Sequence, residues 1–441
     1  MSATATAAVT LRGREVFSYG LADFAQTAAV QFTSMYLLFF YTDMLAVGAG
    51  VVGTIFVFSR LWDAINDPLM GMLVDHTHTR FGRCRPYLMP GSVVLCLALV
   101  MAFSEVALQG WMLLLYVVLS YNLFNMAYTA TNLPVTAQLP LMTTCPRERV
   151  RLSATRAFSQ SLAYALLPLA AEAVLQSSGG HRDASAYTFI AALLGVMCIV
   201  TFVIAFLLIK ERVDTSPQRL TRSDIVAVFT CQWDWLILLG VNVLVSLALI
   251  SRVSAGIYYF TYVVGDMTWF GTFMTLSTLA MVPCSIAASR LAHRMSKETF
   301  AIAGCVVGLV GNLLIVIAPT SVPLLLIGGT LGGCAVGAFI SVLFAMEGDV
   351  ADKVLSATGI QAQGLVCAMV ALGYKVALGL GAGTVGALLG GAGYVAEAAV
   401  QADSVLTAIQ IAFAWVPLIA VLFGVVLLMA YPRTEPTTAI R

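Results

Sequence analysis

Charged side chains are scarce in this sequence, and the shortage decides its class. Only 10% of the 441 residues are Asp, Glu, Lys or Arg, whereas 60% are hydrophobic, and the mean hydropathy is +0.92. Soluble domains carry about 25% charged residues. The composition therefore excludes a soluble globular protein and indicates an integral membrane protein. The net charge of +1 provides no basic surface, so we expect no nucleic-acid partner.

Histidine and paired cysteine motifs are also rare. The four histidines fall in predicted loops or at helix ends, so no intramembrane histidine site for a metal can be built. The nine cysteines lack paired metal-ligand spacing and mostly lie inside apolar segments, as small buried hydrophobic residues do. Ser/Lys catalytic motifs and repeated pore loops are missing too, which argues against an intramembrane enzyme and against a channel. The first 14 residues lack the apolar core of a cleavable signal peptide.

Long apolar runs, by contrast, fill the chain. A membrane-spanning helix needs ~20 mostly apolar residues, and twelve segments qualify, six on each side of the polar stretch 210–223. They are 17–45, 51–75, 88–106, 111–140, 151–176, 186–209, 233–264, 269–292, 300–317, 322–346, 356–389 and 405–431. We expect an all-α membrane protein whose twelve transmembrane helices form two pseudo-symmetric six-helix bundles. The expected domains are an N-terminal bundle (1–209), a cytoplasmic central loop (210–230) and a C-terminal bundle (231–441).

The Lys and Arg residues predict the orientation of these helices. Almost all Lys and Arg residues in the predicted loops follow even-numbered segments or lie at the termini. The loops on the opposite side contain only Arg182. Positively charged loops stay in the cytoplasm. We therefore expect a multi-pass protein of the cell inner membrane with both termini in the cytoplasm.

One apolar segment contains an unexpected group of charges. Arg60, Asp63 and Asp67 are spaced i, i+3, i+7 and share one helical stripe, with Asn66 beside it. Each charge near the bilayer centre costs roughly 2.5–3.5 kcal/mol, so such residues usually serve a function. Two carboxylates one turn apart repel unless a cation, a shared proton or a basic group lies between them. A hard cation such as Na⁺ prefers oxygen ligands of this kind.

A structural ion-pair network is the alternative explanation of the same charges. Arg60 could pair with Asp63, and Arg252 or Lys375 with Asp67. The presence of two acids rather than one favours the cation site, because a purely structural use would need only matched charges.

The loop after this segment carries a second motif. Gly71 stands four residues before Asp75, and the pattern Arg80-x-Gly82-Arg83-x-Arg85 follows. Gly71 would allow a neighbouring helix to approach closely. Asp75 could pair with the basic loop and with an opposing helix end, forming a latch that is made in one conformation and broken in another. Alternatively, the arginines only mark topology.

These motifs resemble those of known transporters. The Gly-x-x-x-Asp…Arg-x-Gly-Arg loop is similar to the signature loop of the major facilitator superfamily. More narrowly, "WDAINDPLMG" (62–71) and "RFGRCRPY" (80–87) resemble the glycoside–pentoside–hexuronide:cation symporters. The resemblance implies the major facilitator fold and cation-coupled symport of a sugar or glycoside by alternating access. It also implies no enzyme activity, no cofactor beyond the coupling ion (Na⁺ or H⁺), contact with membrane lipid, and a mechanism that a monomer can perform.

The resemblance also assigns site residues. It places the cation among Asp63, Asn66, Asp67 and Thr129, which would be the metal ligands for Na⁺, with Lys375 nearby. For the substrate it points to five positions: Asp23, Thr27, Asn132, Thr136 and Arg156.

The substrate positions depart from one branch of the family. Thr27 and Asn132 stand where melibiose-permease-type members carry sugar-binding aspartates, and Thr136 stands where they carry a stacking tryptophan. Asp23 matches the glucuronide-permease-like members. Arg156 could hold a substrate carboxylate in bidentate fashion or pair with Asp23, so a hexuronide is one possible substrate. Because the sugar-binding acids are missing, a lipid or drug transporter on the same scaffold is the alternative function.

Overall fold

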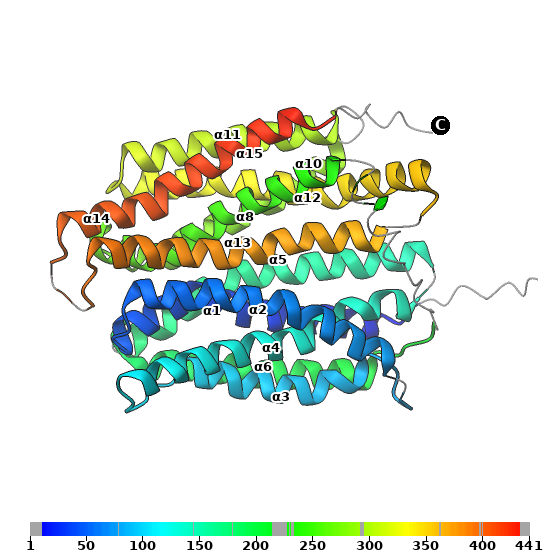
Figure 1. The fold of residues 1–441 in the computed structure, drawn as a ribbon, viewed down its shortest axis with the longest axis horizontal. Coiled ribbons are helices and arrows are strands. Elements are labelled where there is room, and N and C mark those ends of the chain that lie inside the picture. Colours follow the sequence, from blue (N-terminus) through cyan, green and yellow to red (C-terminus); the bar gives the residue numbers. More distant parts are fainter. Residues whose placement is uncertain are drawn as a thin grey trace, which may run out of the picture. The chain divides into compact units, whose positions relative to one another are not determined.

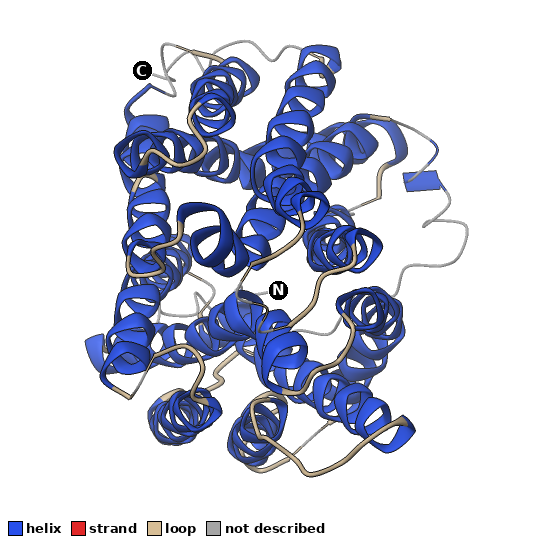
Figure 2. Cartoon of the chain, turned by 90° about the vertical axis from the view of Figure 1, so that its left-hand side faces the viewer, coloured by secondary structure: helices blue, strands red, loops and turns tan. Residues whose placement is uncertain are grey.

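The computed structural model describes residues 11–77, 79–143, 145–178, 180–213, 227–228, 230, 233–291, 295–360, 363–396, 398 and 400–432. Helices make up most of this part of the chain, and its only β-pairing is an isolated bridge between Thr79 and Gly82 (Figure 2). The first half contains α1 (Gly13–Phe39), η1 (Phe40–Met44), α2 (Ala49–His76), α3 (Arg85–Ala102), α4 (Trp111–Met142), α5 (Pro146–Ser177) and α6 (Ala184–Leu208) (Figure 1). The second half contains α8 (Asp234–Tyr258), η2 (Tyr259–Val264), α9 (Trp269–Leu279), α10 (Met281–Leu291), α11 (Lys297–Ile317), α12 (Val322–Thr358), α13 (Gln363–Ala392), α14 (Asp403–Gln410), η3 (Ile411–Trp415) and α15 (Val416–Ala430).

The predicted spans correspond to these helices. Ten helical stretches within the described residues are long and apolar enough to cross a membrane. The first two predicted spans overlap α1 and α2, which are 27 and 28 residues long, contain the charged residues discussed above and are not among those ten stretches. The prediction of an all-helical membrane protein is confirmed.

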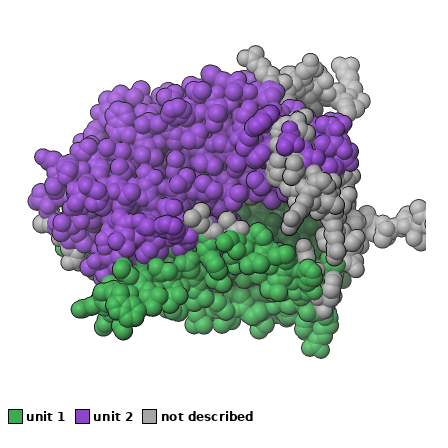
Figure 3. All heavy atoms as spheres, in the orientation of Figure 1, with its two compact units in different colours: residues 1–33, 61–218 green, residues 34–60, 219–441 purple. Residues whose placement is uncertain are grey.

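The chain divides into two compact units, coloured separately in Figure 3. The first consists of residues 1–33 and 61–218, and the second of residues 34–60 and 219–441. Both α1 and α2 therefore contribute one end to each unit. The expected limits of the two six-helix bundles, 1–209 and 231–441, stay a prediction.

Small residues allow close helix packing in the first unit. A Cβ added at Gly195 of α6 would lie 2.5 Å from the Cys96 sulfur of α3, and one at Gly91 of α3 would lie 2.9 Å from the Thr131 side chain of α4. Inside a membrane the hydrophobic effect does not drive helices together, so short-range contact between small residues does. These glycines hold α3 between α4 and α6.

The second unit uses the same device where α11 packs on α12. A Cβ at Gly308 would lie 2.4 Å from the Ala335 Cβ, and one at Gly311 would lie 2.5 Å from the Gly328 carbonyl oxygen. The two backbones are thus in direct contact along one stripe of each helix.

A buried polar contact stabilises the π-helical turn η3. A π-turn leaves carbonyl groups without their ordinary helical partners, and the Ser251 hydroxyl donates to the Ala412 carbonyl at 2.7 Å. The Arg252 side chain donates to the Phe413 carbonyl at 3.4 Å and to Asn312 Oδ1 at 2.5 Å. Arg252 therefore bonds within the second unit, and the alternative that it pairs with Asp67 stays untested.

We expect Gly311→Ala to lower the melting temperature of the purified protein, because overpacking of this kind costs about 1–3 kcal/mol. Gly348→Ala is the matched control, since no described atom lies within 4 Å of a Cβ at that position of α12. The control should melt at the wild-type temperature or slightly above it. Equal melting temperatures for the two variants, measured by intrinsic fluorescence in detergent, would contradict the close contact.

Candidate functional site

The predicted cation residues lie on α2 and α4 in the first unit. Asp63 is buried, and Asn66 and Asp67 are half-buried. The buried Thr129 hydroxyl of α4 donates to Asp67 Oδ1 at 3.0 Å. Pro68 lies inside α2, and because proline has no N–H, the carbonyl of residue 64 loses its helical hydrogen bond. The structure thus brings oxygen atoms from two helices together.

The composition of this cluster fits a monovalent hard cation. Two carboxylates, an amide and a hydroxyl supply oxygen ligands without sulfur or imidazole, which is the set that Na⁺ prefers. The Asn66 Nδ2 atom is buried without a hydrogen bond, and rotation of the amide would present its oxygen at the same place. The described residues contain no group of three His, Cys, Asp or Glu that could hold a metal ion.

Lys375 lies on α13 in the second unit and is half-buried. Its expected place near the two carboxylates stays a prediction.

A second polar cluster joins α1, α4 and α5 inside the first unit. The Arg156 Nε donates to Asp23 Oδ1 at 3.1 Å, and its terminal nitrogen donates to Asn132 Oδ1 at 3.3 Å. The Asp23 side chain is fully buried, whereas that of Arg156 is 20% exposed. Three of the five predicted substrate residues therefore form one hydrogen-bonded group. Of the two roles considered for Arg156, pairing with Asp23 is the one present in this structure.

Gln26 is a member of this cluster that sequence reasoning missed. Its amide nitrogen donates to Asp23 Oδ1 at 2.7 Å and to Asn132 Oδ1 at 3.2 Å. Its own oxygen, Oε1, is buried and accepts no hydrogen bond among the described residues. The available signal was its position one helical turn after Asp23, on the same face of α1.

The other two predicted substrate residues lie apart from these bonds. Thr136 is exposed, and its hydroxyl donates to the Asn132 main-chain carbonyl one turn earlier in α4 at 3.0 Å. Thr27 is buried next to Gln26 on α1. Their expected contact with substrate stays a prediction.

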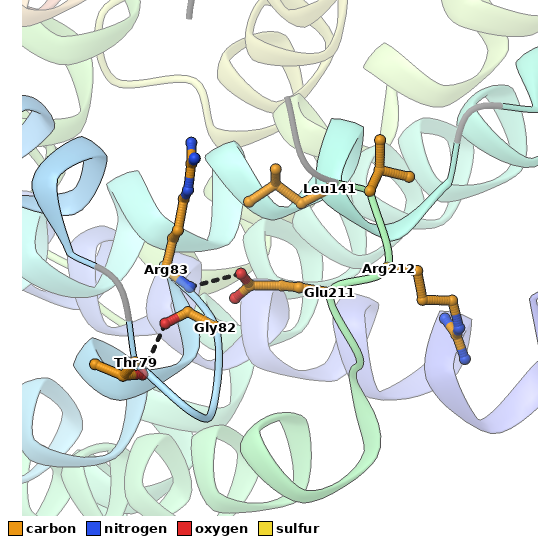
Figure 4. A pocket seen from close by; sticks show the side chains of 7 residues that line it. Thr79, Gly82, Arg83, Leu141, Glu211 and Arg212 are labelled. Carbon is orange, nitrogen blue, oxygen red and sulfur yellow. Dashed lines mark hydrogen bonds between the residues drawn. The ribbon is translucent and has the colours of Figure 1, made fainter. Parts of the chain in front are cut away.

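The signature loop is held by an acid from a distant part of the chain. Glu211, which follows α6, accepts hydrogen bonds from the backbone N–H groups of Arg83 at 2.7 Å, Cys84 at 3.0 Å and Arg85 at 3.1 Å. Its carboxylate thus lies at the N-terminus of α3, where the helix dipole favours negative charge. Figure 4 shows Glu211 against the loop, in a cavity of about 270 Å³ that Leu141 and Arg212 also line.

Gly82 makes this arrangement possible. Its φ is +114°, in a region that favours glycine. A Cβ at Gly82 would lie 2.5 Å from the Glu211 carboxylate. Arg212, the next residue, forms an ion pair with Glu15 at 2.6 Å, so the segment after α6 is fastened to the start of α1 as well.

The structure changes the picture of the predicted gating residues. No described atom lies within 4 Å of a Cβ at Gly71, and the expected close helix approach there stays a prediction. Arg85 donates to the Phe206 carbonyl and lies 4.9 Å from the Phe206 ring centre, and Arg80 stacks on Phe81 at 4.7 Å. The side chain of Asp75 lies outside the described residues, so the predicted latch is not tested.

Comparison with known proteins decides the family. The sequence model described as "MFS/sugar transport protein" matches residues 18–435. The chain belongs to the MFS/sugar transport protein family. It is a transporter and not an enzyme, and the predicted major facilitator fold and the resemblance to cation symporters of sugars are confirmed.

Relatives within this family span nearly the whole chain. The isoprimeverose transporter of Lactiplantibacillus pentosus is 30% identical over 96% of this chain and 89% of its own length. The glucuronide carrier protein homolog of Escherichia coli (strain K12) is 27% identical over 96% of this chain and 93% of its own.

Solved structures agree on the fold. The crystal structure of the nucleoside transporter NupG matches with a TM-score of 0.64 at 13% identity, covering 95% of this chain and 98% of that one. The inward-facing, unoccupied structure of a bacterial homolog of the human lysosomal transporter Spinster matches with a TM-score of 0.68 at 12% identity, covering 95% of both chains. This member of the MFS/sugar transport protein family thus has the major facilitator fold over most of its length.

We expect Gly82→Ala to destabilise the protein more than Gly180→Ala does. Both glycines have a positive φ, at +114° and +95°, but no described atom lies within 4 Å of a Cβ at Gly180. The control therefore carries only the backbone strain, about 1–3 kcal/mol, whereas Gly82→Ala also displaces the Glu211 carboxylate. Thermal unfolding of the two purified variants would measure the difference, and similar losses would mean that Glu211 does not depend on Gly82.

Proposed function

We propose that the protein carries a sugar or glycoside together with a cation, using α4 to connect the two sites. Thr129 of α4 bonds to Asp67 of the cation cluster, and Asn132, three residues later, accepts hydrogen bonds from Gln26 and Arg156 of the second cluster. Residues spaced i, i+3 lie on the same helical face. This shared turn of α4 is the observation that carries the proposal.

Binding of the cation and the substrate is coupled through this turn. A cation between Asp63 and Asp67 neutralises their repulsion and fixes Thr129, which in turn holds Asn132 ready for the substrate. By thermodynamic reciprocity, bound substrate then raises the cation affinity by the same factor. One cation moved through about 100 mV supplies about 2.3 kcal/mol, enough for roughly fifty-fold accumulation of substrate.

The oxygen ligands of this cluster favour Na⁺, with H⁺ carried by Asp63 and Asp67 as the other possibility. The substrate cluster favours a neutral sugar or glycoside, because Asp23 already neutralises the Arg156 guanidinium. A hexuronide would have to displace that carboxylate. The relatives include both an isoprimeverose transporter and a glucuronide carrier protein homolog. A cluster of two charges and two amides gives no support to the alternative of a lipid or drug.

We propose that the transporter lies in the inner membrane with both termini in the cytoplasm, because its Lys and Arg residues gather in the loops on the side of the termini. A single chain contributes both clusters, so we take the monomer as the unit of transport.

The first test is uptake of labelled glycosides, including a glucuronide, into energised vesicles with and without a Na⁺ gradient. Accumulation should depend on the gradient and be lost in Asp67→Asn. Thr129→Val removes only the hydroxyl and should raise the cation concentration for half-maximal uptake about tenfold, because a hydrogen bond to a carboxylate contributes roughly 1.5–3 kcal/mol. Thr129→Ser keeps the hydroxyl and should resemble wild type. If a folded, inserted protein accumulates no glycoside, the sugar assignment is wrong.

A second test compares the roles of Asn132 and Thr136, which lie one turn apart on α4, in substrate binding. Asn132→Ala removes the acceptor shared by Gln26 and Arg156 and should raise the KM for substrate about tenfold or more. The Thr136 hydroxyl bonds only to its own helix in this structure, so Thr136→Ala should leave KM nearly unchanged. A large effect of Thr136→Ala alone would instead support the contact that the family resemblance implies.

A further inference from the structure

The first helix of each half ends in a tyrosine-rich π-turn. In the first half, α1 passes into η1, and in the second half α8 passes into η2. The sequences at these ends are "FFYTD" (39–43) and "YYFTY" (258–262). Both ends belong to the second compact unit, so the contacts between them can be followed atom by atom.

A buried aspartate joins these two ends to the loop after α13. Asp43 is 6% exposed, and its carboxylate accepts hydrogen bonds from the Tyr394 hydroxyl at 2.7 Å and from the Thr42 hydroxyl at 2.6 Å. The Thr42 hydroxyl lies 2.7 Å from that of Tyr258, and the Tyr262 hydroxyl lies 3.1 Å from that of Tyr394. We call these five residues the Asp43 cluster.

Tyr394 is fixed as the donor to Asp43. It follows Gly393, whose φ of +81° turns the chain after α13, and its ring meets those of Tyr258 and Tyr262 edge-on, with centres 5.4 and 5.9 Å apart. Burial, together with the nearby Asp43 carboxylate, raises the pKa of Tyr394. The hydroxyl therefore keeps its proton and donates a hydrogen bond to the carboxylate.

Glycines bring α2 and α13 into backbone contact beside this cluster. A Cβ at Gly386 would lie 2.6 Å from the Gly53 Cα, one at Gly390 would lie 2.6 Å from the Gly50 nitrogen, and one at Gly53 would lie 2.9 Å from the Gly383 carbonyl oxygen. We call this contact the glycine seam.

The seam ends beside the charged stripe of α2. A Cβ at Gly379 would lie 2.6 Å from the Arg60 Cγ, and Asp63 of the cation cluster is three residues further along α2. The seam thus reaches to within one helical turn of the cation site.

Both contacts join residues 34–60 of the first half to helices of the second half, and both are suited to separate and re-form. Backbones that meet through glycine have no interlocking side chains, so they can part without rotamer changes. The Asp43 cluster is linked by single hydrogen bonds between hydroxyl and carboxylate groups, each of which water can replace.

We propose that the Asp43 cluster and the glycine seam form a gate, closed in this structure, that must open at the Ala49 end of α2 for substrate to pass. The proposal rests on the proposed function, because transport by alternating access requires each end of the protein to open in turn. Since α2 also carries Asp63 and Asp67, opening of the seam would move the helix that holds the cation.

The test uses a reporter cysteine beneath the gate. Ser254 of α8 is 1% exposed, and its hydroxyl donates to the Ser34 carbonyl at 3.4 Å. Ser254→Cys, in a background with the nine native cysteines replaced, is purified into nanodiscs and reacted with a maleimide without sugar or an ion gradient. The parent should react slowly. Tyr394→Phe should react about tenfold faster, because one hydrogen bond to a carboxylate is lost. Tyr259→Phe is the control, since its hydroxyl donates to Pro319 outside the cluster.

The seam supplies an independent pair of variants. Gly386→Ala forces α2 and α13 apart and should also accelerate labelling, whereas Gly391→Ala, on the same helix with no described atom within 4 Å of its Cβ, should not. If Tyr394→Phe does not fold, the comparison of Gly386→Ala with Gly391→Ala tests the gate. Labelling of Tyr394→Phe and Gly386→Ala at the parent rate, or equal acceleration in the controls, would overturn the gate.

The labelling result is independent of the substrate. If the labelling rates change as expected but the protein accumulates no glycoside, the gate is supported and the sugar assignment is wrong. If symport is normal but the variants label the reporter cysteine at the unchanged rate, the gate is wrong and the proposed function is supported.

Discussion

The hydrogen bond from Thr129 to Asp67 sets the register between α2 and α4, and the candidate sites depend on that register. With Thr129 facing Asp67, the next turn of α4 places Asn132 against Gln26 and Arg156. A rotation of α4 by one residue, about 100°, would separate both clusters at once. The buried charge pair of Asp23 and Arg156 is expensive to form unless its hydrogen bonds are satisfied, so the polar clusters favour one arrangement of the helices over others.

Glycine serves two opposite purposes in this molecule. At Gly311 and Gly328, close backbone contact holds α11 and α12 together within one half of the sequence. At Gly53 and Gly386 the same geometry joins a helix of the first half to one of the second, and the proposed gate requires this contact to be temporary. The difference lies in what surrounds each contact. The first continues into packed alanines such as Ala335, whereas the second is bordered by exchangeable hydroxyl hydrogen bonds.

The sequence predicted the helices well because the bilayer requires each spanning helix to reach a minimum length and to be mostly apolar. It also predicted that Asp63, Asn66, Asp67 and Thr129 belong together, although only the resemblance pointed to Thr129, since α4 is far from α2 in the chain. Gln26 and Glu211 were missed for a physical reason. Gln26 is an uncharged residue whose value depends on Asp23 of its own helix and on Asn132 of α4, and Glu211 acts on backbone N–H groups, which leave no pattern in a sequence. Gly82 was noticed as part of a motif, but its partner was not visible before the structure.

The glycine seam and the charged stripe lie on one helix, α2, and the signature loop follows directly after this helix. Its first turns carry Gly50 and Gly53 of the glycine seam, its middle carries Asp63 and Asp67, and its far end leads into the loop that Glu211 holds. Because the loop end is fastened within the first unit and the seam end packs with the second, a change in the charge of the middle acts on a helix that is fixed at one end and separable at the other. In the proposed mechanism a cation bound to Asp63 and Asp67 removes their repulsion on α2 and also binds the Thr129 oxygen of α4. In the proposed mechanism the cation state biases whether α2 stays on the seam or leaves it, so that a site without direct contact to the gate controls it.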